Sequence, residues 1–204
     1  TQLKGRALDQ EIAEDAYHTP YIRPLVQPKF RRKKKGLTPA ERGTATHLVL
    51  QYLDLQNLDV PGQVEKLRLE AKLTAEQAAA VDVPALRRFL ESPLAEEMRQ
   101  AETAAREYRF TVLMPARDYD PAAAEEDSIL LQGVVDCWFE TPKGVTVVDF
   151  KTDFVQTEED VAQHAELYRG QLAAYSLALE RVLEKAVTRK ALYFLQAGKT
   201  VEVS

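Results

Sequence analysis

Two carboxylates and a lysine stand near the ends of two apolar segments that resemble buried strands. Asp136 lies in "GVVDCWF", and Asp149 and Lys151 lie in "VTVVDFK". Residues two apart on a strand point to the same face, so Asp149 and Lys151 share one side of the predicted sheet. Burying a charge without compensation is costly. These side chains therefore sit either at an exposed strand end or in a site that uses them.

A divalent cation is the ligand that this arrangement suits best. A turn over 142–144 ("PKG") is expected between the two strands, and it brings Asp136 and Asp149 near the same strand end, roughly in register. Two carboxylates on neighbouring strands favour a hard cation such as Mg²⁺ or Mn²⁺. A lysine beside such a cation can orient water or neutralise charge on a phosphate. A salt bridge at the hairpin end is the alternative interpretation.

Two further pairs of residues, each four apart on a predicted helix, can join this site. Gly43 and His47 share one face of the first helix, and a neutral imidazole can serve as a third metal ligand. Gln171 and Tyr175 share one face of a later helix, where their polar ends can hold phosphate or water. The alternative for both pairs is ordinary packing at the edge of the core.

Clear end signals mark the helices in the first half of the chain. In "LTPAERGTATHLVLQYLDL", Thr38 is the expected N-cap, Pro39 the first helical residue, and Glu41 the partner in a capping box. Three short helices are expected within "KLTAEQAAAVDVPALRRFLESPLAEEMRQAE". Their expected starts are Thr74, Asp82 or Val83, and Ser92.

Strand signals dominate the second half of the chain. Strands are expected over 105–116, 128–141 and 145–151, with an acidic surface loop between the first two. A long amphipathic helix is then expected from about His164 to Lys185. A strand, a turn at Ala197 and Gly198, and a short final strand close the chain. This order predicts an α+β or α/β core with one sheet.

Bulk composition narrows the class of protein. A chain of 204 residues supports one good core, and its formal charge of −5 gives no global basic surface for nucleic acid, so any such contact must be local. The single cysteine, Cys137, excludes an internal disulfide framework and a four-cysteine zinc or iron–sulfur site, and it indicates a reducing, cytoplasmic compartment. No run of about 18 apolar residues is present, so no membrane span is expected.

Residues 1–36 are expected to form a poorly packed, basic N-terminal segment or linker ahead of one domain over 37–204. The basic run ends this segment as a solvated linker or as a contact to a phosphate backbone. Its members are Arg31, Arg32, Lys33, Lys34 and Lys35. The sequence starts without Met and without an apolar leader, which favours a processed chain or a piece of a longer one.

Taken in order, the motifs G-x-x-x-H, Q-G-x-x-D, D-x-K-T and Q-x-x-x-Y resemble the RecB-type nuclease branch of the PD-(D/E)xK superfamily. The residues that carry them are Gly43, His47, Gln132, Gly133, Asp136, Asp149, Lys151, Thr152, Gln171 and Tyr175. The resemblance covers roughly residues 36–195. It is stronger still for the C-terminal nuclease domain of AddA-type bacterial helicase–nucleases.

This resemblance implies a fold and a reaction. The fold is a restriction-endonuclease-like core of the α/β (α+β) class, in which a mixed β-sheet is flanked by helices. The reaction is Mg²⁺-dependent hydrolysis of DNA phosphodiester bonds by an exonuclease, with Mn²⁺ as a substitute metal, leaving a 5′-phosphate and a 3′-hydroxyl.

The resemblance also implies roles for residues of the site. The implied metal ligands are His47, Asp136, Asp149 and the main-chain carbonyl of Phe150. The implied catalytic residues are Lys151, which positions the attacking water, together with Asp136, Asp149, Gln171 and Tyr175. Glu107 in "REYRF" occupies the place of an acid that the family often has on the first strand.

The same resemblance implies partners. These are DNA as single strand or duplex ends, an AddA-type helicase motor upstream in the same full-length chain, and an AddB-type subunit, acting in double-strand-break repair by recombination in the bacterial cytoplasm. The segment "AGKT" at 197–200 lacks the Gly that a phosphate-binding loop requires at Tyr193, so no ATP site is expected, and the single cysteine argues against an iron–sulfur cluster. The alternative function is a catalytically silent module for DNA binding or assembly, which would have lost a carboxylate or the lysine.

Overall fold

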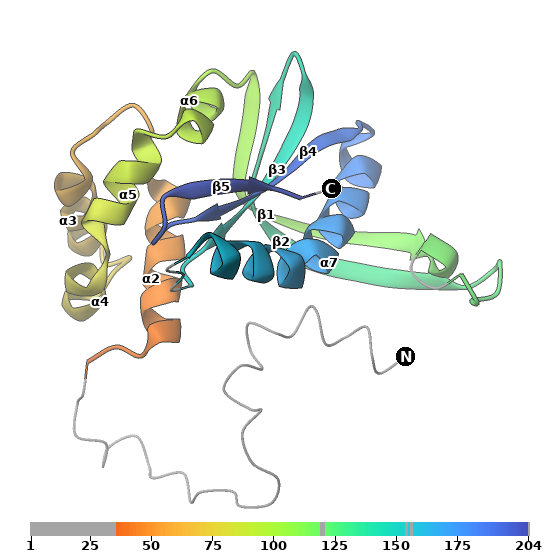
Figure 1. Cartoon of the computed structure of the whole chain (residues 1–204), viewed down its shortest axis with the longest axis horizontal. Helices are drawn as coiled ribbons and strands as arrows, with labels where there is room; N and C mark the ends of the chain where they lie inside the picture. The colour runs from red at the N-terminus through yellow and green to blue at the C-terminus, as the bar shows by residue number, and fades with distance from the viewer. Residues whose placement is uncertain (1–35, 119–120, 154, 156, 204) are drawn as a thin grey trace, which may run out of the picture.

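A computed structural model of the chain describes residues 36–118, 121–153, 155 and 157–203. The basic run over 31–35, and almost all of the predicted N-terminal linker, lie outside the described residues. A five-stranded mixed sheet in the order β1-β2-β3-β4-β5 forms the centre (Figure 1). The strands are β1 (Thr103–Pro115), β2 (Ser128–Thr141), β3 (Gly144–Lys151), β4 (Val187–Phe194) and β5 (Lys199–Glu202), and a short 3-10 helix, η2 (Ala116–Asp118), follows β1. Only the β3–β4 pair is parallel among these described strands.

Helices cover both faces of the sheet, as an α/β fold requires. The helices are α2 (Pro39–Tyr52), α3 (Val60–Leu69), α4 (Ala75–Ala80), α5 (Val83–Leu90), α6 (Pro93–Arg99) and α7 (Glu158–Leu183). One apolar core joins α2, α3, α5 and α6 to the sheet face that carries Cys137 and Val148 (Figure 1). A second core joins α7 to the opposite face, which carries Trp138 and Val147. The predicted mixed sheet flanked by helices is confirmed.

The predicted helix starts are confirmed by their caps. The Glu41 amide donates to the Thr38 hydroxyl over 3.2 Å, and the Thr38 amide donates to the Glu41 carboxylate over 2.8 Å, which is a complete capping box. The side chains of Thr74, Asp82 and Ser92 cap α4, α5 and α6. Helix α3 was not predicted.

The long helix starts earlier than predicted. Helix α7 begins at Glu158, whereas the sequence pattern placed its start at about His164. A capping box between Thr157 and Asp160 defines the true start. Three acidic residues in the first turn stabilise the helix, because their negative charges lie at the positive end of the helix dipole. The first turn of the helix is acidic and lacks apolar residues, and the apolar stripe begins only at the buried Val161. The apolar pattern therefore does not indicate the true start of the helix.

The hairpin between β2 and β3 forms as predicted, with pairing up to Thr141 and Gly144. Gly144 has a φ of +112°, and a Cβ at this position would overlap the side chain of Thr188. Only glycine satisfies both conditions without strain. Within the part of the chain that the structure describes, no helix is both long and apolar enough to cross a membrane.

Cys137 is a buried thiol, and we predict that it resists alkylation in the folded chain. Its side chain has no exposed surface, and burial raises its pKa to about 12. Since the thiolate is the nucleophile, we expect modification by iodoacetamide at pH 8 to be about 10³-fold slower than in the guanidinium-unfolded chain. Mass spectrometry over time measures both rates. Equal rates would show that the thiol is accessible in the native state.

Candidate active site

The predicted site residues gather where β2 parts from β3. The last described pair between these strands joins Cys137 to Val148, and from there β2 continues with β1 (Figure 1). We call this point, between Cys137 and Val148, the fork. One step past it, the register places Asp136 opposite Asp149. The Phe150 amide donates to Asp136 Oδ2 over 2.8 Å. At the fork, a hydrogen bond to a side chain therefore takes the place of the main-chain hydrogen bonds between β2 and β3.

Strand β1 is irregular at the same level. The pairs Arg106–Cys137 and Tyr108–Val135 flank Glu107 without including it, and Glu107 has a φ of +50°. This left-handed conformation costs a residue other than glycine roughly 1–2 kcal/mol. Such strain persists where the surrounding structure fixes it, and it clusters at functional sites. The strained residue therefore makes the fork a candidate site.

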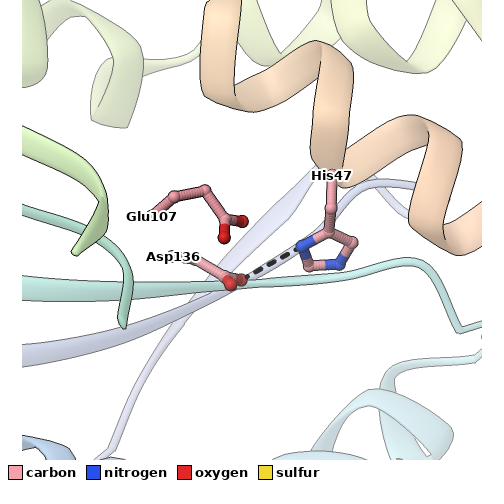
Figure 2. A group of neighbouring side chains, drawn as sticks. All are labelled: His47, Glu107 and Asp136. Carbon is pink, nitrogen blue, oxygen red and sulfur yellow. Dashed lines mark ion pairs between the residues drawn. The ribbon is translucent and has the colours of Figure 1, made fainter. Parts of the chain in front are cut away.

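Three potential metal ligands converge there from separate elements. Figure 2 shows the Glu107 and Asp136 carboxylates, from β1 and β2, pointing toward His47 on α2. One ligand atom of each lies within 4.8 Å of the other two. Arg106 helps to fix this approach, because its Nη1 donates to the carbonyls of Leu50 (2.9 Å) and Leu53 (2.5 Å) at the end of α2.

The electrostatics of the fork keep Asp136 ionised. Burial alone would raise the pKa of the Asp136 carboxyl, but His47, the Phe150 amide and the charge of Lys151 together hold that pKa below its usual value. His47 Nδ1 lies 3.5 Å from Asp136 Oδ2 (Figure 2). A lowered pKa means that this carboxylate contributes stability at neutral pH and loses it as the pH falls through the folded-state value.

Lys151 and its partners form a second group beside the first. Its Nζ lies 2.8 Å from Asp149 Oδ2 and 3.2 Å from Gln171 Oε1, and Gln171 Nε2 donates to the Tyr175 hydroxyl over 3.0 Å. Asp149 and Lys151 are only 3% and 2% exposed. The buried strand therefore ends in an ion pair that contacts α7. Each charge offsets the free-energy cost of burying the other.

The structure thus divides the predicted residues into two groups. His47 and Asp136 lie together with Glu107, whereas Asp149 pairs with Lys151 and lies outside that three-residue group. Phe150 contributes its amide to Asp136. Glu107 entered the sequence analysis only through the family resemblance, because its place opposite Asp136 depends on the long-range β1–β2 register.

Two glycines allow the close approach of the elements around the site. A Cβ on Gly43 would lie 3.1 Å from Thr152 Oγ1, so α2 passes close to the end of β3. A Cβ on Gly133 would lie 2.7 Å from Phe110 Cζ and 3.2 Å from Tyr175 Cε1. Both glycines belong to the sequence motifs, and in each case the missing side chain makes room for a neighbour.

We predict that Gly133→Ala destabilises the fold by about 1–3 kcal/mol, because the added methyl group displaces two packed rings. Gly170→Ala is the matched control: Gly170 lies on the exposed side of α7 with nothing within 4 Å of its Cβ position. This control is expected to raise stability by about 0.5–1 kcal/mol. Urea unfolding measures both changes. If Gly133→Ala is as stable as the wild-type chain, the rings of Phe110 and Tyr175 can move aside without a loss of folding free energy.

Comparison with known proteins places this geometry in a family. Residues 16–203 match the PD-(D/E)XK nuclease superfamily. The chain is 38% identical over 205 residues to the A subunit of the ATP-dependent helicase/nuclease of Acetivibrio thermocellus, covering 98% of this chain and 16% of that protein. It is 36% identical over 199 residues to the protein of the same name from Ruminiclostridium cellulolyticum, covering 96% of this chain and again 16% of the relative.

The relatives are therefore much longer than this chain, which spans 16% of the length of these two. The protein of the same name from Heliobacterium modesticaldum is 37% identical over 183 residues, covering 85% of this chain and 13% of the relative. These names confirm the predicted resemblance to the nuclease domain of AddA-type subunits. Since the family match runs over nearly the whole chain, the chain belongs to the PD-(D/E)XK nuclease superfamily.

Proposed function

We propose that the chain is a metal-dependent deoxyribonuclease that hydrolyses phosphodiester bonds in DNA, with Mg²⁺ as its metal and Mn²⁺ as a substitute. The observation that carries this proposal is the meeting of two groups at the fork. The first offers carboxylates and an imidazole within 4.8 Å of one another, and the second offers a buried lysine held by an aspartate. Both a bound cation and a fixed positive charge near the attacked phosphate favour hydrolysis of a phosphodiester.

The donor set fits a hard divalent cation. Mg²⁺ and Mn²⁺ prefer carboxylate oxygens and accept imidazole, and His47, Asp136 and Glu107 supply these donors from three elements. Asp136 is the strongest candidate because its lowered pKa favours the ionised form. We include Asp149 and the carbonyl of Phe150 among the proposed ligands, on the family resemblance. A bound cation would supply positive charge to the phosphate and favour deprotonation of water.

Within this proposal Lys151 orients the attacking water and offsets negative charge on the phosphate. The ion pair with Asp149 and the contact with Gln171 fix the ammonium, so little reorganisation is needed during the reaction. The Gln171–Tyr175 hydrogen bond places a hydroxyl and an amide next to that ammonium, where they can hold the substrate strand. The low exposure of Lys151 strengthens its electrostatic effect.

The names of the relatives suggest the setting in which this reaction occurs. We propose that the chain supplies the exonuclease part of an AddA-type subunit, in which a helicase motor lies upstream in the same full-length chain and an AddB-type subunit is the partner. Double-strand-break repair by recombination in the bacterial cytoplasm is the proposed process. Residues 37–204 form the proposed nuclease domain, and the basic run over 31–35 is proposed to contact the DNA backbone.

The test is hydrolysis of linear DNA, single-stranded and duplex, with Mg²⁺, with Mn²⁺ and with EDTA. We expect cleavage with either metal, none with EDTA, and fragments that carry a 5′-phosphate and a 3′-hydroxyl. Ligation of the fragments, with and without prior phosphatase treatment, identifies the ends. DNA binding without cleavage in either metal would favour the silent module instead.

A further inference from the structure

We propose that Tyr168 is a positioning residue for Lys151, and that Asp153 anchors the tyrosine ring in turn. The inference rests on the proposed function, because it gives a role to a residue beside the proposed catalytic lysine. Tyr168 lies on α7 one turn before Gln171, and Asp153 follows β3. Neither belongs to the four sequence motifs.

The ring of Tyr168 forms one wall of the ammonium site. Lys151 Nζ lies 3.6 Å from the ring centroid, which is a close cation–π contact. The same nitrogen lies 2.8 Å from Asp149 Oδ2 and 3.2 Å from Gln171 Oε1. A carboxylate, an amide oxygen and a ring face therefore surround the ammonium. A lysine side chain is otherwise flexible, so such a cradle fixes the position of its charge.

The ring itself is held from its far end. The Tyr168 hydroxyl donates to Asp153 Oδ2 over 2.9 Å, and His164 Nδ1 lies 3.9 Å from the same oxygen. Asp153 comes two residues after Lys151. Its hydrogen bond to Tyr168 therefore connects the segment after β3 to α7, the helix that carries Tyr168. The hydrogen bond from Tyr168 to Asp153 thus holds the ring in place against Lys151.

A ring suits this place better than another acid. Asp149 already supplies one negative charge to Lys151, and a second carboxylate would leave an excess of negative charge where the DNA phosphate must approach. The face of the ring attracts the ammonium without carrying a full charge. The ring therefore holds the ammonium without adding to the negative charge of the carboxylates already at the fork.

The chain contains a matched control pair. Lys72 Nζ lies 3.9 Å from the ring centroid of Tyr52, nearly the same contact as between Lys151 and Tyr168. Tyr52 is 46% exposed and lies on α2, outside the proposed site. Removing the Tyr52 ring therefore repeats the chemical change without disturbing Lys151.

The test compares Tyr168→Leu, Tyr168→Phe and Tyr52→Leu in the 204-residue chain. For Mg²⁺-dependent cleavage of a short single strand, we expect Tyr168→Leu to lower kcat about tenfold with little change in KM, because the lost contact acts on the reacting group and not on binding. Tyr168→Phe keeps the ring face but loses the hydrogen bond to Asp153, so its kcat should lie between those of Tyr168→Leu and the wild-type chain. Tyr52→Leu should have wild-type kcat.

A spectroscopic readout accompanies the kinetics. In ¹H–¹³C spectra of lysine ε-methylene groups, we expect two signals shifted by an aromatic ring, one from Lys151 over Tyr168 and one from Lys72 over Tyr52. Lys151→Met removes the first of these signals and so assigns it. Tyr168→Leu should abolish the Lys151 shift, and Tyr168→Phe should reduce it. Asp153→Ala, at a half-buried position, removes the same hydrogen bond as Tyr168→Phe and should reduce the shift and kcat to a similar extent, so it serves if Tyr168→Leu does not fold.

Wild-type kcat in Tyr168→Leu, or an unchanged ring-current shift, would overturn the inference. Failure of the proposed function looks different. In that case the wild-type chain shows no metal-dependent cleavage at all, while the shifted Lys151 signal still reports whether the ring holds that lysine.

Discussion

Replacing Lys151 by Met is expected to slow Mg²⁺-dependent DNA cleavage by about 10²- to 10³-fold, the usual effect of removing one fixed electrostatic group from an active site. In the proposed reaction this ammonium is the protein's own positive charge nearest the attacked phosphate, held 2.8 Å from Asp149. The rate of release of an end label from linear DNA measures the effect.

The same replacement should also destabilise the fold. Asp149 is only 3% exposed, so Lys151→Met leaves a buried carboxylate without its partner, a change that typically costs about 3–5 kcal/mol. The double variant Lys151→Met with Asp149→Asn removes both charges together and should recover most of that loss in urea unfolding. It should remain inactive, because neither charge is restored. Stability and activity are thereby separated.

Lys185→Met is the control for both measurements. Lys185 pairs with Glu140 over 2.6 Å, but its side chain is 53% exposed, so its loss should change stability by less than about 1 kcal/mol and leave cleavage unchanged. Full activity of Lys151→Met would contradict the role assigned to this lysine. Equal cleavage rates in Lys151→Met and Lys185→Met would contradict that role as well.

Replacing Asp136 by Asn is expected to weaken Mn²⁺ binding by at least about 100-fold, since even residues behind the ligands of a metal commonly contribute 10- to 100-fold. The amide removes the charge that the cation needs while keeping the size of the side chain. Asp136 contacts both His47 and the Phe150 amide. Titration calorimetry with Mn²⁺ measures the affinity.

Glu166→Gln is the matched control for that titration. Glu166 pairs with Arg169 on the exposed side of α7, and its side chain is 65% exposed. This variant should bind Mn²⁺ as the wild-type chain does. Equal affinity in Asp136→Asn and wild type would place the cation elsewhere and remove the support for the fork as a metal site.

Local signals predicted most of the fold. The predicted starts of α2, α5 and α6 depended on a cap and a proline within a few residues, and that of α4 depended on a capping box alone. Such contacts form between near neighbours in the sequence. Helix α3 carries the same local signals, a cap at Asp59 with a proline beside it and the buried apolar residues Val60, Val64 and Leu67 at helical spacing, so it could also have been predicted. The early start of α7 was missed because its first turn is acidic.

The site was less accessible to such reasoning because its geometry depends on long-range register. The hairpin pattern brought Asp136 near Asp149, and helical spacing paired Gln171 with Tyr175, as the structure shows. The left-handed Glu107 and the ring of Tyr168 over Lys151 depend on how β1 meets β2 and how α7 packs on β3. Contacts between distant elements leave little trace in local sequence patterns.

The charged residues at the fork are proposed to act together in cleaving DNA. The most direct test divides the Mg²⁺-dependent cleavage rate of the wild-type chain by that of the Lys151→Met and Asp149→Asn double variant, after urea unfolding has shown that both are folded. A ratio of about 10³ or more is the predicted result. A ratio near one, or a wild-type chain that cleaves nothing when Mg²⁺ is present, would contradict the claim.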